Sequence, residues 1–208
     1  MRLSSCSPGT TASTTTDTRE LIIESAFDCF RRHGLDKTTV VDIARAADVS
    51  RSTVYEYFRD KAQIVEACAE GASQKFYREM ASAMRKGETL EDQLVLAAVF
   101  VTRARRVIEP EDYFDEDEVS LLLTKNAAVL LRECTDFLAP YLAAAKLTGE
   151  IRKDLDTVAA GEWYARMLFS LFSTPSASLD MDDARVVADF VRAHVVRGFA
   201  PDRPARAR

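Results

Sequence analysis

The segment VSRSTVYEYFRDK, from Val49 to Lys61, decides the fold of the amino-terminal part of the chain. Val54 and Phe58 stand four residues apart, which is the spacing of the buried face of a short helix. The other sides of this helix carry an arginine, a serine, a threonine and two tyrosines. A helix that only packs shows one apolar stripe and a solvated remainder. The surplus of hydrogen-bonding groups therefore predicts a second task for the exposed face.

Two amphipathic stretches precede this segment and predict two further helices. The first begins after Asp17 and stops at Gly34, a residue suited to a left-handed helix cap. The second is capped by Thr39, with Asp42 in the place of the usual capping-box glutamate, and it breaks at Asp48. Three short helices with a tight turn between the last two form a helix-turn-helix arrangement.

Helical periodicity continues through the rest of the chain. Few glycines and prolines and the lack of alternating strand patterns indicate an all-α fold, with the helix-turn-helix followed by a larger helical domain. We expect further helices over residues 61–86, 90–107, 119–145, 156–172 and 182–198.

The totals limit the possible functions. The chain has 208 residues, of which 47% are hydrophobic, and this suffices for a core. A net charge of −5 is mild, so any nucleic-acid contact has to come from a local face. The 4 cysteines lack metal-ligand spacing and predict free thiols. No signal-peptide pattern and no run of about 18 apolar residues is present, which predicts a soluble, cytoplasmic protein without membrane contact.

The longer stretch CFRRHGLDKTTVVDIARAADVSRSTVYEYFRDKAQIV, residues 29–65, closely resembles the DNA-binding region of the TetR family of transcriptional regulators. The shared pattern is a glycine, a Thr-Thr pair, "IA", "VS", "Y.YF" and a following lysine, and the resemblance covers about residues 18–66. Asp48 replaces the usual glycine of the turn, and Ala62, Gln63 and Ile64 replace the familiar Glu-Leu region without changing the apolar register. The remainder agrees in helix number and length only.

The resemblance implies a ligand-responsive repressor that binds a palindromic operator as a homodimer and is released by a small apolar or amphipathic effector. It implies the following domains: 1–16 flexible tail, 17–60 helix-turn-helix DNA-binding domain, 61–200 helical ligand-binding and dimerisation domain, and 201–208 flexible tail. In the family the recognition helix lies in the major groove and against phosphates. By position, the base-facing residues are Ser52, Thr53 and Glu56, Arg51 meets a base or a phosphate, and the backbone is contacted by Thr39, Tyr55, Tyr57 and Lys61.

The helices between Phe76 and Met167 are rich in large apolar side chains, which predicts a pocket for an apolar or amphipathic effector. Two arginines in the candidate set could meet a carboxylate or phosphate on such a molecule. The candidates are Phe100, Arg103, Phe114, Asn126, Trp163, Arg166 and Met167.

The apolar stripes of the last two helices exceed what one small domain needs to cover. Pairing them with a twofold mate makes a four-helix bundle. The candidate interface residues are Val187, Phe190, Val191 and His194.

An enzyme and a constitutive architectural DNA binder are the alternatives. An enzyme needs a nucleophile with a base, paired acids or a phosphate loop, and none stands at recognisable spacing, so we predict neither catalytic residues nor a cofactor. Asp112, Asp115 and Asp117 could face a hard cation, but a solvated loop and helix start explains them as well, and no metal is predicted. The architectural alternative would lack an enclosed cavity behind the fourth helix.

Overall fold

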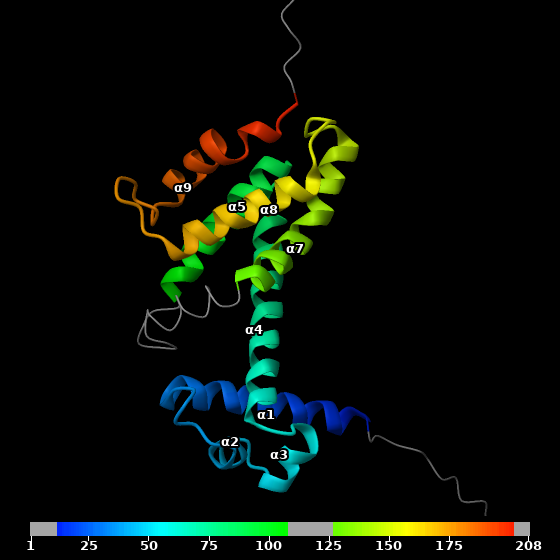
Figure 1. Cartoon of the computed structure of the whole chain (residues 1–208), viewed down its shortest axis with the longest axis vertical. Coiled ribbons are helices and arrows are strands. Elements are labelled where there is room, and N and C mark those ends of the chain that lie inside the picture. The colour runs from blue at the N-terminus through cyan, green and yellow to red at the C-terminus, as the bar shows by residue number, and fades with distance from the viewer. Residues whose placement is uncertain (1–11, 108–126, 202–208) are drawn as a thin grey trace, which may run out of the picture. The chain divides into compact units, whose positions relative to one another are not determined.

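A computed structural model describes residues 12–107 and 127–201 of the chain, and its regular elements there are helices (Figure 1). This confirms the all-α prediction. The α-helices are α1 (Ala12–His33), α2 (Val40–Ala46), α3 (Arg51–Tyr57), α4 (Lys61–Met84), α5 (Leu90–Val107), α7 (Ala127–Thr148), α8 (Thr157–Ser173) and α9 (Ala184–Phe190). A π-helical turn η1 (Val191–Val195) and a 3-10 turn η2 (Arg197–Phe199) follow α9.

Two helix boundaries differ from the sequence-based expectation. Helix α1 begins at Ala12, so part of the expected amino-terminal tail is helical, because the low helix propensity of Ser and Thr is a weak constraint. The last expected helix is not one α-helix. It changes to π-helix after Phe190, where the backbone N–H of Val196 donates to the carbonyl of Val191 at 3.0 Å, one residue further back than in an α-helix.

The chain forms two compact units, Met1–Gln74 and Lys75–Arg208, and the division falls inside α4. The first unit has a core to which α1, α2, α3 and the beginning of α4 contribute. Val54 of α3 and Phe58, the residue that ends this helix, lie in this core, as their spacing predicts. The buried residues with the lowest exposure are Ile22, Ala26, Ile43, Val54, Phe58 and Ile64.

Asp48 holds the turn between α2 and α3 in a left-handed conformation, with φ at +52°. Non-glycine residues adopt this region at a cost, because the Cβ atom crowds the backbone. We expect Asp48→Gly to raise the free energy of unfolding of the first unit by about 1 kcal/mol. Urea titration followed by circular dichroism measures it. Asp48→Ala is the matched control and should be less stable than the parent; a less stable glycine variant would contradict this account.

The second unit is built around α5, α7 and α8, which lie side by side in Figure 1. Its core includes Leu94, Leu138, Tyr164 and Leu168, and the buried hydroxyl of Tyr164 donates to the carbonyl of Leu94. Gly161 lets α8 approach α7 closely, since a Cβ at this position would lie 3.3 Å from a side-chain carbon of Leu142.

Ion pairs at the edge of this core join η1 to α5. The guanidinium of Arg192 lies 3.0 Å from the carboxylate of Asp92 and 3.4 Å from that of Glu91. The pKa of Asp92 lies below its ordinary value, first because the Thr89 hydroxyl donates to it and then because Arg192 does. The carboxylate therefore remains ionised in mild acid and keeps η1 attached to the start of α5.

Candidate functional site

A reciprocal cap fixes the beginning of α2. The Asp42 carboxylate accepts from the backbone N–H of Thr39 at 3.0 Å and from its hydroxyl at 2.6 Å, while that hydroxyl accepts from the backbone N–H of Asp42. These bonds, led by the hydroxyl, hold the pKa of Asp42 below its usual value. Thr39 is exposed, so the residue proposed to contact the DNA backbone also caps the helix.

Hydroxyl groups gather where α3 begins. The Ser50 side chain accepts from the backbone N–H of Thr53 at 3.0 Å and is the cap of this helix. Its oxygen also lies 2.6 Å from the hydroxyl of Ser52 and 2.8 Å from that of Thr53. The first turn of α3 therefore presents three linked groups, each able to donate or accept.

Helix α3 divides into a buried side and a polar side. Val54 is fully buried, whereas Arg51, Ser52, Tyr55 and Glu56 are exposed. A seven-residue helix thus turns four side chains with hydrogen-bonding or charged groups outward.

The remaining two α3 candidates are less accessible. Thr53 and Tyr57 are half-buried, and Tyr57 packs against the core of the first unit. The structure therefore brings six candidates together on α3, with Tyr57 the most constrained of them.

Lys61, at the start of α4, has partners that its position in the sequence did not indicate. Its ammonium donates to the carbonyl of Leu35 and approaches that of Asp36 at 3.5 Å. It also lies 6.0 Å from the ring centroid of Phe30. Lys61 thus ties α4 to the turn after α1, with two of its three N–H donors directed at these carbonyls.

The helix-turn-helix geometry agrees with what the sequence is similar to. The family model of the bacterial regulatory proteins, tetR family, matches residues 22–68, which span the capped α2, the turn and α3. This helix-turn-helix region is that of the TetR family of transcriptional regulators. The regulator TtgR of Pseudomonas putida is 28% identical over 152 residues, which cover 67% of this chain and 71% of that protein.

Solved structures of transcriptional regulators share the fold. A TetR-family regulator from Pectobacterium atrosepticum has a TM-score of 0.64 at 18% identity, with 94% of this chain and 100% of that chain covered. FadR from Bacillus subtilis, solved in complex with stearoyl-CoA, has a TM-score of 0.55 at 17% identity, covering 84% of this chain and 97% of that chain. At these identities the likeness concerns the fold.

The predicted effector residues do not form one group. Trp163 is 46% exposed and its indole N–H donates to the carbonyl of Val195 at 3.4 Å. Arg166 is exposed and paired with Glu162 on the same helix. Arg103 is exposed, Phe100 and Met167 are half-buried, and Phe114 and Asn126 lie outside the described residues, as does the acidic run with Asp112, Asp115 and Asp117.

An aromatic row in the second unit was not predicted as a whole. The ring of Phe100 lies 5.2 Å from that of Phe76, which also contacts Tyr77, and Tyr77 lies 5.0 Å from Phe137. Phe137 in turn contacts Tyr141. All five rings are half-buried. Burial raises the pKa of Tyr77. The one sequence signal is the i, i+4 spacing of Phe137 and Tyr141, which does not show that α4 and α5 add further rings.

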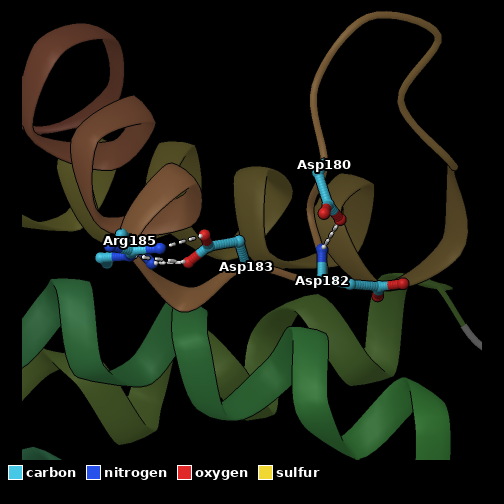
Figure 2. A network of polar contacts seen from close by, with 4 residues as sticks. All are labelled: Asp180, Asp182, Asp183 and Arg185. Atoms are coloured by element: carbon cyan, nitrogen blue, oxygen red, sulfur yellow. Dashed lines mark hydrogen bonds and ion pairs between the residues drawn. The ribbon is translucent and has the colours of Figure 1, made fainter.

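A cavity of about 130 Å³ lies elsewhere in the second unit, between α5, α8 and the loop before α9. This is smaller than the roughly 300–1,000 Å³ of ordinary ligand pockets. The loop that lines it is held by Asp180, whose carboxylate accepts from the backbone N–H of Asp182 at 3.0 Å; the next residue, Asp183, lies outside the lining, caps α9 and pairs with Arg185 (Figure 2). Its lining residues are Thr102, Leu171, Pro175, Ser176, Leu179, Asp180, Met181 and Asp182, and no predicted effector residue is among them.

Two of the four expected interface residues lie inside the protomer. Val187 and Val191 are 0% exposed and belong to the core of the second unit, because their side of α9 and η1 packs on α5. They have no surface to offer to a partner. Phe190 is half-buried and His194 is exposed, and their rings lie 5.5 Å apart.

No cluster of three His, Cys, Asp or Glu residues suited to a metal ion occurs in residues 12–107 and 127–201. Over the same residues, no helix combines the length and the apolar character needed to cross a membrane.

Proposed function

We propose that this TetR-family protein is a cytoplasmic, ligand-responsive repressor that binds a palindromic operator as a homodimer. The observation that carries the proposal is the exposed face of α3, where a capped helix presents Arg51, Ser52, Tyr55 and Glu56 on a structured support. Selection of random duplexes with the full-length protein tests it. The expected product is an inverted repeat whose half-sites lie about 10 base pairs apart or a multiple of that.

Thr53 in α3 and Lys61 at the start of α4 should contribute to DNA binding in different ways. Thr53→Ala should weaken binding to the preferred sequence and leave affinity for random duplexes unchanged, since it removes a hydroxyl that we propose to contact the bases. Lys61→Ala should weaken all duplexes alike and lower the slope of log affinity against log salt by about 0.9, the value for one phosphate contact. Fluorescence anisotropy over a salt titration measures both.

The salt dependence of Lys61→Ala also distinguishes a phosphate contact from a purely structural role of the lysine. If the ammonium acts only by holding the turn at Leu35, affinity falls while the salt slope stays at the parent value. Binding of both variants like the parent across the titration would contradict the assignment of α3 and Lys61 to the interface. Lys37→Ala is a control that removes a nearby exposed charge.

The homodimer is supported by the outward side of α8 and η1. Trp163 of α8 is 46% exposed and bonds to Val195 of η1, and Phe190 of α9 and His194 of η1 form a ring pair. Exposed apolar side chains grouped on two helices favour an isologous contact with a second copy. Because Val187 and Val191 are buried, the proposed interface consists of Trp163, Phe190 and His194.

The effector site is proposed at the aromatic row of α4, α5 and α7. Half-buried rings can accept an apolar molecule by small changes of side-chain conformation, and FadR with stearoyl-CoA shows that this fold can take an amphipathic ligand. We propose a small apolar or amphipathic effector that contacts Phe76, Phe100 and Phe137. Native mass spectrometry of the purified protein would detect a bound molecule of this kind.

A constitutive architectural DNA binder is the second candidate. The small cavity near Asp180 favours it, since its volume is below that of an ordinary effector site. An architectural protein would bind duplexes without sequence preference and would carry no copurified molecule. A selected palindrome together with a bound molecule would exclude it.

A further inference from the structure

Arg51 and Tyr55 form a pair on the exposed side of α3. The guanidinium carbon of Arg51 lies 5.3 Å from the centroid of the Tyr55 ring, and one terminal nitrogen donates to the Tyr55 hydroxyl at 3.3 Å. The two residues are four positions apart, about 40° around the helix axis, so one turn of helix sets their contact. Tyr55 is 43% exposed, and the pair stands at the surface.

The neighbouring arginines are arranged differently. Arg45 of α2 faces the carboxylate of Asp42 at 3.8 Å, and Arg59 after α3 faces that of Asp60 at 3.0 Å. Arg51 instead lies against a neutral phenol, which orients the guanidinium without neutralising its charge. The positive charge of Arg51 therefore remains available to an acceptor outside the protein.

The contact also leaves the donors that base recognition needs. A guanidinium has five N–H groups in a rigid fork, and the bond to Tyr55 occupies one of them. Two parallel donors still match the O6 and N7 acceptors of guanine in the major groove. A free arginine side chain would lose rotamer entropy on binding, whereas one already held by a ring loses less.

We propose that Arg51 reads a guanine in each operator half-site and that Tyr55 is the positioning residue that aims it. The inference rests on the proposed function, in which α3 lies in the major groove. It assigns Tyr55 to orienting Arg51 rather than to a phosphate. The pair acts as a unit, so removing either member should remove the same base preference.

The test is a selection of random duplexes with the full-length protein, followed by affinity measurements on the selected operator and on versions with each base changed. In the parent, replacing one particular guanine per half-site should weaken binding about 5- to 150-fold. In Arg51→Lys, which keeps the charge and loses the fork, the same replacement should change affinity by less than about threefold. Binding to random duplexes should be unaltered.

Tyr55 variants separate positioning from a phosphate contact. Tyr55→Leu should reduce the guanine preference as far as Arg51→Lys does, and the double variant should be no worse than either single one. Tyr55→Phe keeps the ring and should retain a guanine preference within about twofold of the parent's. Arg59→Lys is the matched control and should leave it unchanged.

Two results would overturn the inference. One is that Arg51→Lys retains the preference for every guanine of the operator that the parent selects. The other is a Tyr55→Leu variant that binds every duplex more weakly with its guanine preference intact, which would assign Tyr55 to a phosphate. A Tyr55→Leu variant with a lowered thermal midpoint would be set aside, and Arg51→Lys with Tyr55→Phe would decide. A parent that selects no sequence at all would instead refute the proposed function.

Discussion

Replacing Phe190 with Asp should convert the protein to a monomer and weaken operator binding by at least about 100-fold. Phe190 is half-buried, packs in part against the core of the second unit and lies beside His194, close in sequence to the carbonyl of Val195 that receives the Trp163 indole. In a twofold-symmetric dimer both copies of the substituted residue lie in the interface, so two carboxylates would be buried there without partners. A monomer then holds one half-site and loses the second contact that a dimer makes at high effective concentration.

Light scattering at micromolar concentration and anisotropy with the selected operator measure the two effects. Phe190→Leu is the matched control, since it preserves an apolar contact and should remain a dimer. Val191→Arg should behave differently from Phe190→Asp, because Val191 is 0% exposed and a charge there would unfold the second unit. A Phe190→Asp variant that stays dimeric with the parent's affinity would refute the proposed interface.

Operator and effector should weaken each other's binding by the same factor, about 100-fold, which corresponds to ~2.7 kcal/mol. Helix α4 runs from Lys61 to Met84 without a break and contributes to both compact units. A molecule that displaces Phe76 acts on the same helix that begins at Lys61, one of the residues proposed to contact DNA. A dimer must match successive major grooves about 34 Å apart, so a change of a few Å in the separation of the two reading surfaces disfavours simultaneous contact.

Calorimetry with the molecule found by native mass spectrometry, in the presence and absence of saturating operator, measures this coupling. Phe100→Ala should lower the affinity for that molecule and leave the affinity for the operator unaltered, because Phe100 belongs to the aromatic row and not to α3. Equal ligand affinities with and without operator would show that the molecule is a passenger. The induction mechanism would then be wrong.

The parts of the fold that were predicted correctly depend on residues close together in the chain. The cap of Thr39 with Asp42 and the break at Asp48 each involve groups within four positions, and both are present. Helix propensity and side-chain hydrogen bonding act over that range, so the local sequence is enough to predict these caps and turns.

The candidate sites of the second unit depend on which helix covers which face. Val187 and Val191 read as an outward stripe, but α5 covers them. The aromatic row draws Phe76, Phe100 and Phe137 from three different helices, and periodicity within one helix cannot show that they meet. The π-helical turn after Phe190 likewise has no local signal, since Val191–Val195 contains neither glycine nor proline.

Gly161 has a mechanical consequence for the second unit. With no side chain at this position, the backbone of α8 lies against Leu142 and Thr135 of α7, at a level where even one added carbon would be in tight contact. A space this narrow admits no molecule between the two helices. Helices α7 and α8 should therefore move as one rigid block, and any strain that a bound molecule introduces is transmitted by helices outside this pair.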